Sequence, residues 1–484
     1  MNTHRQLVVG VDSSTQSTKV EARDLDTGEV VATGTAAHPP TTPPVSEQDP
    51  TAWWSALVEA MAQLGDHRDD VVATAVAGQQ HGLVLLDAAG DPVRPAKLWN
   101  DTTSAPHSDR LVAELGADRW ARDVGSVPVP AFTIAKLAWV ADREPEALQR
   151  TAKVMLPHDY LTWRMTGQHV TDRGDASGSG WYDPSSGAVR DDLLAAATGG
   201  DGSEWRDRVP RVLGPTDRAG VLNPDAAEAL GLHDGVVVGA GSGDNMGAAL
   251  GLGLRAGDVA ISLGTSGTVF AVSDSATHDP SGAVAGFASA SGSFLPLVCT
   301  LNATKVTDTV AGWLGTDAPG LAELALAAAD DPGTVTLVPY FDGERTPNLP
   351  DATGIFSGLS NTTTREQLAL AAHDGVLCGL IGGVDALRAV GATVDGRVFL
   401  LGGGSRSAAY RQRAADLLGQ QVTVPDTDET VATGAALQAA VVATDGSFVS
   451  CAERWELGAG ATLDPRRDAS AVRVRYAEAA TAAG

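Results

Sequence analysis

Near its N-terminus the chain reads LVVGVDSSTQSTKV over residues 7–20, and this stretch carries the strongest indication of architecture. An apolar run that stops abruptly at polar residues and then resumes predicts two β-strands joined by a tight turn. The other half of the chain repeats the pattern in VAISLGTSGTVFAVS, residues 259–273. In both halves a helical stretch follows, and then a strand that ends in another turn. This order predicts an α/β fold with two domains related by duplication.

The later strand of each half ends in a different kind of turn. VVATAVAG, residues 71–78, leads into the amide and imidazole side chains of Gln79, Gln80 and His81. In the second half RVFLL, residues 397–401, leads into a glycine-rich turn instead. That turn consists of Gly402, Gly403, Gly404 and Ser405.

The composition is that of an ordinary globular protein and excludes several partners. The 484 residues are too many for one core, and 43% of them are hydrophobic. A formal net charge of -26 argues against nucleic acid or an anionic membrane, because both would be repelled. The three cysteines are far apart, which indicates a reducing compartment and no metal site. We find neither a signal core nor an uncharged apolar run of membrane-spanning length, so we expect a cytoplasmic protein.

The two polar turns are candidate phosphate-binding sites. A strand that stops at Ser, Thr and Gly residues exposes main-chain N–H groups and hydroxyls, which bind phosphate oxygens. One such turn is weak evidence, because hairpins routinely contain Gly and Ser. One turn in each domain predicts a pair that holds a polyphosphate from both sides. The residues concerned are Ser14, Thr15 and the basic Lys19 in the first half, and Gly264, Thr265 and Ser266 in the second.

Asp12 stands where the first strand ends, at the carboxyl edge of the predicted sheet. A carboxylate in that place can hold Mg²⁺ through water while the turns bind the nucleotide phosphates. The alternative is an Asp that only caps the turn. The second phosphate turn makes us favour the metal role.

Asp244 lies in VVVGAGSGDNMGAALGLG, residues 236–253, where an apolar strand meets a glycine-rich turn and a helix. It could be a helix N-cap, or a general base that accepts a proton from a hydroxyl attacking phosphorus. The spacing of the glycines does not fit a Rossmann fingerprint, and no Gly-Lys pair exists for a P-loop. Both common nucleotide-binding motifs are therefore excluded.

Gln80 and His81 offer groups that suit sugar hydroxyls. A lone His is more often structural, and chemistry alone would not select His81. The loop at Trp99 has the same ambiguity, as a platform for a sugar or as simple packing.

Taken together, these elements resemble the FGGY carbohydrate kinases over essentially the whole chain. VDSSTQSTK (11–19) is similar to the first phosphate turn of that family, SLGTSG (262–267) to the second, and LLGGGS (400–405) to the nucleoside-binding turn. GSGDN (241–245) resembles the catalytic segment. The resemblance implies that Asp244 is the general base, with Asn245 beside it at the substrate, and that Asp12 and Asp244 hold Mg²⁺.

Further stretches resemble the branch of the family that phosphorylates D-xylulose. They are SEQDPTAWW (46–54), GQQHG (78–82), LWND (98–101), LPHDYL (156–161) and TDRGDASGSGWYD (171–183). By this resemblance Gln80 and His81 would hold the ketose. Gln80 departs from the pattern, because Met is common at that position in the branch. Other sugars or polyols, such as ribulose or gluconate, therefore stay open.

The resemblance implies two ribonuclease-H-like (actin-like ATPase) domains around a central cleft. Residues 1–250 would form the sugar-binding domain and 251–484 the ATP-binding domain, with the last helix free to return to the first. The implied substrates are ATP and D-xylulose, the implied metal is Mg²⁺, and the implied product is D-xylulose 5-phosphate. An actin-like ATP-binding protein without sugar chemistry is the alternative from another class. The oligomeric state is left open, with a homodimer as one option.

Overall fold

The computed structural model describes residues 5–427 and 429–482, and the chain forms two compact α/β units. The first unit comprises residues 5–254, 278–295 and 429–457. The second comprises residues 255–277, 296–427 and 458–482. The prediction of a two-domain α/β fold is confirmed. The chain returns twice to the first unit after residue 254, and the last helix belongs to the second unit.

A mixed sheet organises the first unit, in the strand order β13-β14-β5-β1-β2-β3. Strands β1, β5 and β14 run parallel, whereas β1, β2 and β3 form an antiparallel meander. Every residue of β1 is buried, as its unbroken apolar run predicts for a central strand. The strands are β1 (Leu7–Ser13), β2 (Ser17–Asp24), β3 (Val30–Ala37), β5 (Val71–Gly78), β13 (Arg218–Val221) and β14 (Val237–Gly239), and the short β15 (Ser242–Gly243) pairs with β5.

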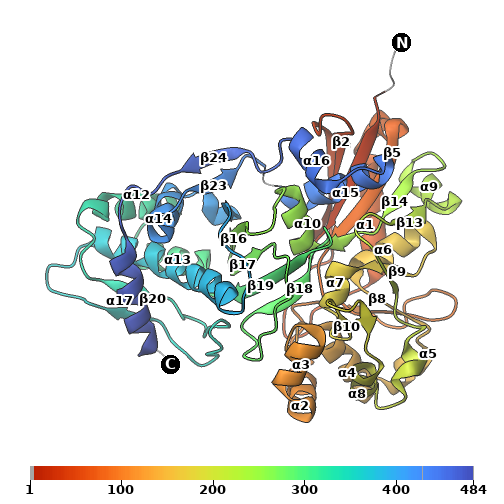
Figure 1. Cartoon of the computed structure of the whole chain (residues 1–484), viewed down its shortest axis with the longest axis horizontal. Helices are drawn as coiled ribbons and strands as arrows, with labels where there is room; N and C mark the ends of the chain where they lie inside the picture. The colour runs from red at the N-terminus through yellow and green to blue at the C-terminus, as the bar shows by residue number, and fades with distance from the viewer. Residues whose placement is uncertain (1–4, 428, 483–484) are drawn as a thin grey trace. The chain divides into compact units, whose positions relative to one another are not determined.

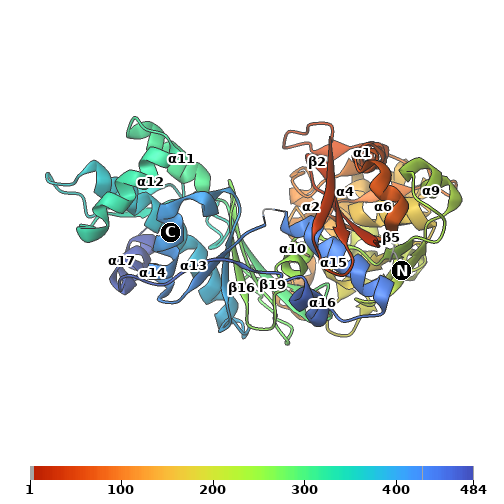
Figure 2. The same cartoon turned by 90° about the horizontal axis from the view of Figure 1, so that it is seen from above.

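Two helices from distant parts of the sequence pack on this sheet at very close range. In Figure 1 the blue helix α15 (Thr430–Thr444) lies against the red and orange strands, and Figure 2 shows it beside α10 (Asp244–Gly251). A Cβ atom added at Gly434 would lie 1.9 Å from the oxygen of Gly247, and one added at Gly10 would lie 1.9 Å from that of Ala432. Only glycine permits such approaches. The small residues at these contacts therefore allow α15 to pack closely against both α10 and β1.

The rest of the first unit surrounds this framework. Its other helices are α1 (Pro50–Ala62), α2 (Ala105–Leu115), α3 (Ala117–Val124), α4 (Thr133–Arg143), α5 (Pro145–Arg150), α6 (Pro157–Thr166), α7 (Arg173–Ser177), α8 (Asp191–Thr198), α9 (Pro224–Leu230) and α16 (Phe448–Arg454). Its short strands are β4 (Glu47–Gln48), β6 (Val84–Leu86), β7 (Ala96–Lys97), β8 (Lys153–Met155), β9 (Val170–Asp172), β10 (Tyr182–Asp183), β11 (Ala188–Val189), β12 (Arg211–Leu213) and β18 (Ala285–Ala288).

The second unit repeats the central motif of the first. Strand β16 pairs with β17 in antiparallel fashion and with β22 in parallel, as β1 does with β2 and β5. The sheet continues through β19 on one side and through β23 and β24 on the other. The strands are β16 (Val259–Leu263), β17 (Gly267–Ala271), β19 (Phe294–Thr300), β22 (Val398–Leu401), β23 (Val422–Pro425) and β24 (Gly460–Leu463), and β20 (Thr336–Val338) pairs separately with β21 (Ile355–Ser357).

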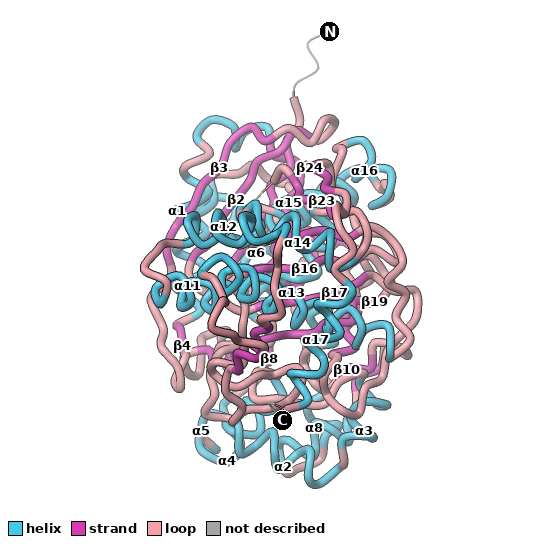
Figure 3. The backbone as a smooth tube through the Cα atoms, turned by 90° about the vertical axis from the view of Figure 1, so that its left-hand side faces the viewer, coloured by secondary structure: helices cyan, strands magenta, loops and turns pink. Residues whose placement is uncertain are grey.

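Helices enclose the second sheet, as Figure 3 shows in cyan around β16 and β17. They are α11 (Thr304–Trp313), α12 (Ala318–Ala327), α13 (Arg365–Ala389), α14 (Ala408–Leu418) and α17 (Ser470–Thr481). By length and composition α13 could cross a membrane, and the sharply bent pair α15–α16 passes the same test together. However, 78% of the most apolar window of α13 is buried within the protein, as expected for a core helix.

Candidate active site

Asp12 reaches the carboxyl edge of the first sheet at the second-last position of β1. It faces Lys19 across the β1–β2 pair and Ala77 across the β1–β5 pair. Because β1 and β5 run parallel and end together, the turn after β5 lies at the same edge. The side chain of Asp12 is only 7% exposed, and its buried Oδ1 has no hydrogen-bond partner. A buried carboxylate oxygen without a hydrogen-bond partner at a strand end indicates a ligand-binding site.

Asp244 arrives at this edge because β15, the two residues before it, pairs with the end of β5. Helix α10 begins at Asp244, and Gly243 occupies the N-cap position. Asn245 donates from its main-chain N (2.7 Å) and from Nδ2 (2.8 Å), and both bonds fall on Oδ1 of Asp244. Burial raises the pKa of Asp244 to about 6, against the opposing effect of these bonds. The carboxyl group is thus fixed in orientation and is weakly basic near neutral pH.

Asp12 senses the charge of Asp244. Burial and that charge together raise the pKa of Asp12 to about 7, and Lys19 opposes the shift. A bound divalent cation would favour the ionised form of both groups, since it supplies the opposite charge that the site lacks. Among the described residues no group of three or more His, Cys, Asp or Glu could hold a metal by itself. The donor set therefore fits a cation that the two acids share with phosphate oxygens.

Gln80 and Asn245 form a continuous amide chain to Asp244. Asn245 Nδ2 donates to Gln80 Oε1 at 3.0 Å, in addition to its bond to Asp244. Gln80 Nε2 is buried without a hydrogen-bond partner. A Cβ atom at position 243 would lie 2.6 Å from Gln80 Cγ, so Gly243 is required for this contact. The unpaired amide group is a donor available to a hydroxyl-bearing ligand.

His81 is held in an uncommon conformation by aromatic and polar contacts. Its φ of 65° lies in the left-handed region, which non-glycine residues rarely occupy. Its Nδ1 lies 3.0 Å from the main-chain oxygen of Gly178, and its ring centroid lies 4.9 Å from that of Phe132 and 5.4 Å from that of Phe287. Neither phenylalanine was predicted as a site residue. Phe287 lies in the 278–295 segment, which no local pattern assigns to the first unit.

The first polar turn is tied to its surroundings through Thr15. The hydroxyl of Thr15 donates to Gln79 Oε1 (3.2 Å) and accepts from Trp99 Nε1 (2.9 Å). Ser14 closes the turn by donating its hydroxyl and its main-chain N to the oxygen of Ser17, both at 3.0 Å. Trp99, which the sequence left ambiguous, therefore contacts the turn predicted to bind phosphate.

Lys19 has a partner that the sequence did not reveal. Its Nζ lies 2.7 Å from Oε1 and 2.8 Å from Oε2 of Glu429, the residue that precedes α15. Both side chains are more than one-third exposed, so a phosphate could reach Lys19 by replacing this partner. A separation of 410 positions in the sequence explains why no local pattern indicates the pair.

A second cluster of ionisable side chains lies next to the turn that precedes Asp244, around the fully buried His158 of α6. Its Nε2 is 3.2 Å from Asp159 Oδ1, 3.3 Å from Asp172 Oδ1 and 3.4 Å from Asp175 Oδ2. Burial alone would lower the pKa of His158, but the neighbouring Asp159, Asp172 and Asp175 raise it to about 9, while burial raises the pKa of Asp175 well above its ordinary value. A Cβ atom on Gly241 would lie 2.6 Å from His158 Nδ1, which places this side chain against the turn that carries Asp244.

In the second unit the polar turn and the glycine-rich turn line one cavity of about 700 Å³. Gly264 and Thr265 contribute from the first of these turns, and Gly403 and Gly404 from the second. The lining does not include three other predicted residues, Ser266, Gly402 and Ser405. Gly402 has a φ of 79°, and Ser405 donates its hydroxyl to the oxygen of Gly402 at 2.8 Å, so both shape the turn.

Aromatic side chains form part of the wall of this cavity. The rings of His373 and Tyr410 lie 4.6 Å apart, and Tyr410 donates its hydroxyl to Thr307 Oγ1 at 3.2 Å. Burial lowers the pKa of His373 to about 4, so it is neutral and behaves as a flat apolar group. A partly apolar pocket of this size beside main-chain N–H groups suits a nucleoside with its phosphates.

Comparisons with known proteins identify the family of the chain. Residues 7–251 match the FGGY family of carbohydrate kinases, N-terminal domain, and residues 259–443 match its C-terminal domain. The chain is 47% identical over 460 residues to the xylulose kinase of Streptomyces coelicolor, covering 95% of this chain and 92% of that protein. The xylulose kinase of Streptomyces rubiginosus is 48% identical, covering 95% of this chain and 92% of that protein. The crystal structure of xylulose kinase from Bifidobacterium adolescentis is 43% identical, with a TM-score of 0.88 over 98% of this chain and 99% of that one.

Proposed function

We propose that this chain, which belongs to the FGGY family of carbohydrate kinases, transfers the γ-phosphoryl group of ATP to D-xylulose. The products are D-xylulose 5-phosphate and ADP, as the identity of 47% over nearly the whole length of a xylulose kinase suggests. The observation that carries the proposal is the convergence of Asp12, Asp244 and the Gln80–His81 turn at one edge of one sheet. ATP is the phosphoryl donor expected of a kinase of this family.

Asp244 is the general base in this proposal. It accepts the proton from the C5 hydroxyl of the sugar as that oxygen attacks phosphorus. Because both bonds from Asn245 fall on Oδ1, Oδ2 is the oxygen that we assign to the proton. A pKa raised to about 6 by burial makes Asp244 a better base than an ordinary aspartate while it stays mostly ionised at pH 7.

The sugar would be held by Gln80 and His81. The Nε2 of Gln80 is buried and unpaired, and Asn245 fixes the opposite end of that amide. His81 offers its ring beside Phe132 and Phe287, which form an apolar wall. A polar donor and an aromatic wall together match the two faces of a sugar.

Each unit offers its own candidate groups for the phosphates of ATP. Ser14, Thr15 and Lys19 offer hydroxyls and a cation for the phosphates, as do the N–H groups of Gly264, Thr265 and Ser266. The turn from Gly402 to Ser405 would shape the nucleoside pocket. Asp12 and Asp244 are the residues that we assign to Mg²⁺, which would spread the negative charge of the phosphoryl group in transfer.

We place the reaction in the cytoplasm, in keeping with the few and widely spaced cysteines of the sequence. The acidic net charge supports small molecules as its partners, with neither nucleic acid nor an anionic membrane among them. A homodimer is the assembly that we would test first, by light scattering.

The test is a sugar panel in an assay that couples ADP release to NADH oxidation. D-xylulose, D-ribulose, L-ribulose, glycerol and gluconate are compared at equal ATP. We expect D-xylulose to give the highest kcat/KM. Another member that exceeds it tenfold would show that the substrate is wrong while the family assignment stands, and Gln80 is then the first residue to examine.

A further inference from the structure

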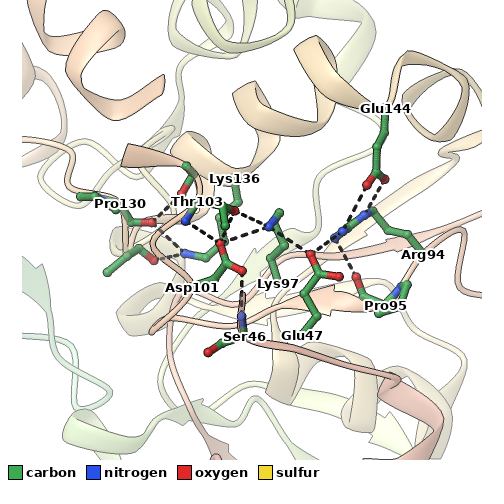
Figure 4. Close-up of polar contacts among 12 residues, drawn as sticks. Ser46, Glu47, Arg94, Pro95, Lys97, Asp101, Thr103, Pro130, Lys136 and Glu144 are labelled. Atoms are coloured by element: carbon green, nitrogen blue, oxygen red, sulfur yellow. Dashed lines mark hydrogen bonds and ion pairs between the residues drawn. The ribbon is translucent and has the colours of Figure 1, made fainter. Parts of the chain in front are cut away.

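Near the turn that carries Gln80 and His81 lies a buried polar network that the proposed reaction does not use. Figure 4 shows it extending from Glu144 and Arg94, through Glu47 and Lys97, to Asp101. Lys97 Nζ lies 3.0 Å from Glu47 Oε1, 3.1 Å from Asp101 Oδ1 and 3.9 Å from the centroid of the Trp139 ring. Lys97 and Asp101 are both fully buried. Buried charges of this kind persist only where they are paired and hydrogen-bonded.

A second fully buried lysine, Lys136, reaches into the same region from α4. Its Nζ donates to the main-chain oxygens of Pro130 (3.2 Å), Ala131 and Phe132 (3.5 Å). Burial lowers the pKa of Lys136 to about 7, and the nearby charge of Asp101 opposes that shift. The lysine thus reaches back beyond the start of its own helix, against the unfavourable positive end of the helix dipole. Its three acceptors belong to one short segment, residues 130–132.

That segment packs against the turn that carries Gln80 and His81. Phe132 lies with its ring 4.9 Å from the His81 ring, and the next residue, Thr133, donates its hydroxyl to the main-chain oxygen of His81 at 3.2 Å. His81 has a left-handed φ, so contacts of this kind must maintain its backbone conformation.

The other end of the network is tied to the phosphate turn. Asp101 accepts from the main-chain N of Ser46 (2.9 Å) and from both the N and the hydroxyl of Thr103, which fixes the loop that follows Lys97. Two residues before Asp101, Trp99 donates to Thr15. The buried network therefore reaches the support of Thr15 through the 97–101 loop, and it lies near Lys136, which holds the 130–132 segment beside His81.

We propose that Lys136 is a positioning residue for the sugar: by holding the carbonyls of residues 130–132 it keeps Phe132 against His81. The inference rests on the proposed function only for the identity of the sugar. Lys136 is fully buried and its amine donates to main-chain oxygens, so we expect it to act on sugar binding through Phe132 and His81 and to leave the chemistry at Asp244 intact.

The test is Lys136→Met, which keeps the length of the side chain and removes its donors. We expect the KM for the sugar to rise about tenfold, with kcat and the KM for ATP within about threefold of wild type, as for lost ground-state binding. Arg143→Met on the same helix is the matched control, because its side chain is 66% exposed. An unchanged sugar KM would overturn the proposal. Equal rises in both KM values together with a lower Tm would also overturn it, because they indicate general destabilisation.

Phe132→Leu provides a second, independent arm if Lys136→Met does not fold. It should raise the sugar KM by a similar factor, and in the double variant the two effects should not multiply, because both act on one contact. A sugar KM unchanged in Phe132→Leu, or fully multiplicative effects, would contradict the proposal. All arms use the best sugar of the wild-type panel, so a wrong substrate assignment is seen in the wild type and does not affect the comparison.

Discussion

The β1–β2 turn of the first unit and the β16–β17 turn of the second share a topology and differ in chemistry. In the first, Asp12 faces Lys19 across the hairpin; at the corresponding cross-strand pair of the second, Ser262 faces Thr268. Each hairpin lies beside a parallel strand. One of those strands ends at the amides of Gln79 and Gln80, and the other at glycines that line a cavity of about 700 Å³. The two hairpins thus share a backbone topology, but the first carries charged side chains and the second lies beside a cavity.

This difference predicts that the two regions fail in different ways. Damage in the first unit should remove charged groups that act in phosphoryl transfer, and so reduce kcat. Damage in the second should remove room for the nucleotide, and so raise the KM for ATP. The following substitutions test this division.

Asp244→Asn should have the largest effect. It keeps the shape of the side chain and removes the base, whose loss costs about 10²–10⁴-fold in rate. Because burial raises the pKa of Asp244, loss of the charge should leave the Tm unchanged or higher. The measurement is kcat of the purified variant beside its melting curve, and wild-type turnover would refute the role of Asp244.

Asp12→Asn should lower kcat by about 10²–10³-fold, the usual cost of one electrostatic group in a transition state. It should also change stability with pH. Burial and Asp244 raise the pKa of Asp12 to about 7 from 3.8, so the folded chain binds this proton more tightly than the unfolded chain. Wild type therefore loses this part of its stability as pH rises between these values, and the variant lacks that contribution.

The stability arm of this prediction needs no substrate. In EDTA at pH 8 the Asp12→Asn protein should melt at a higher temperature than wild type, and the difference should vanish near pH 4. Added Mg²⁺ should raise the Tm of wild type more than that of the variant. Equal responses to Mg²⁺ would show that Asp12 is not part of a cation site.

Gly403→Leu addresses the second region. A Cβ atom on Gly403 meets nothing within 4 Å, and this residue lines the cavity, so the larger side chain should occupy nucleotide space without disturbing the fold. We expect the KM for ATP to rise about tenfold at nearly constant kcat, the signature of lost uniform binding. Gly312→Leu is the matched control, because Gly312 also has open space around it and lies outside the lining. A lower kcat with an unchanged KM would contradict the division of roles.

Lys19→Thr gives the first hairpin the residue that the second hairpin has at the corresponding pair. The effect should be the smallest of the four. The ion pair with Glu429 is partly exposed, and such pairs contribute about 0–1 kcal/mol to stability. We expect a rise of about threefold in the KM for ATP and a Tm close to that of wild type. A loss of kcat comparable to that of Asp12→Asn would show that Lys19 acts in the chemical step.

The sequence predicted the elements with a strong local signal. The apolar strands β1, β5, β16 and β22, each followed by a polar or glycine turn, are where the pattern placed them. Asp12 and Asp244 were selected because both stand where a strand gives way to a turn. Gln80 follows β5 and lies at the same edge of the sheet as Asp12 and Asp244, because the parallel strands end together.

The supporting residues had no such signal. Glu429 lies 410 positions from Lys19, and Phe287 enters the first unit through a short return of the chain. Lys136 and His158 are fully buried basic residues, and the sequence does not distinguish them from exposed ones. Their partners are main-chain oxygens and distant carboxylates, so only the folded chain reveals them.

We propose that these two regions serve the transfer of a phosphoryl group from ATP to a sugar. Phosphorus NMR of wild-type protein with ATP, Mg²⁺ and D-xylulose follows every phosphorus species at once. The account predicts that ADP and a sugar monophosphate ester appear in equal amounts, and that omission of the sugar stops ADP formation. Release of inorganic phosphate at the same rate with and without sugar would contradict it, and would indicate an ATP-hydrolysing switch instead of a kinase.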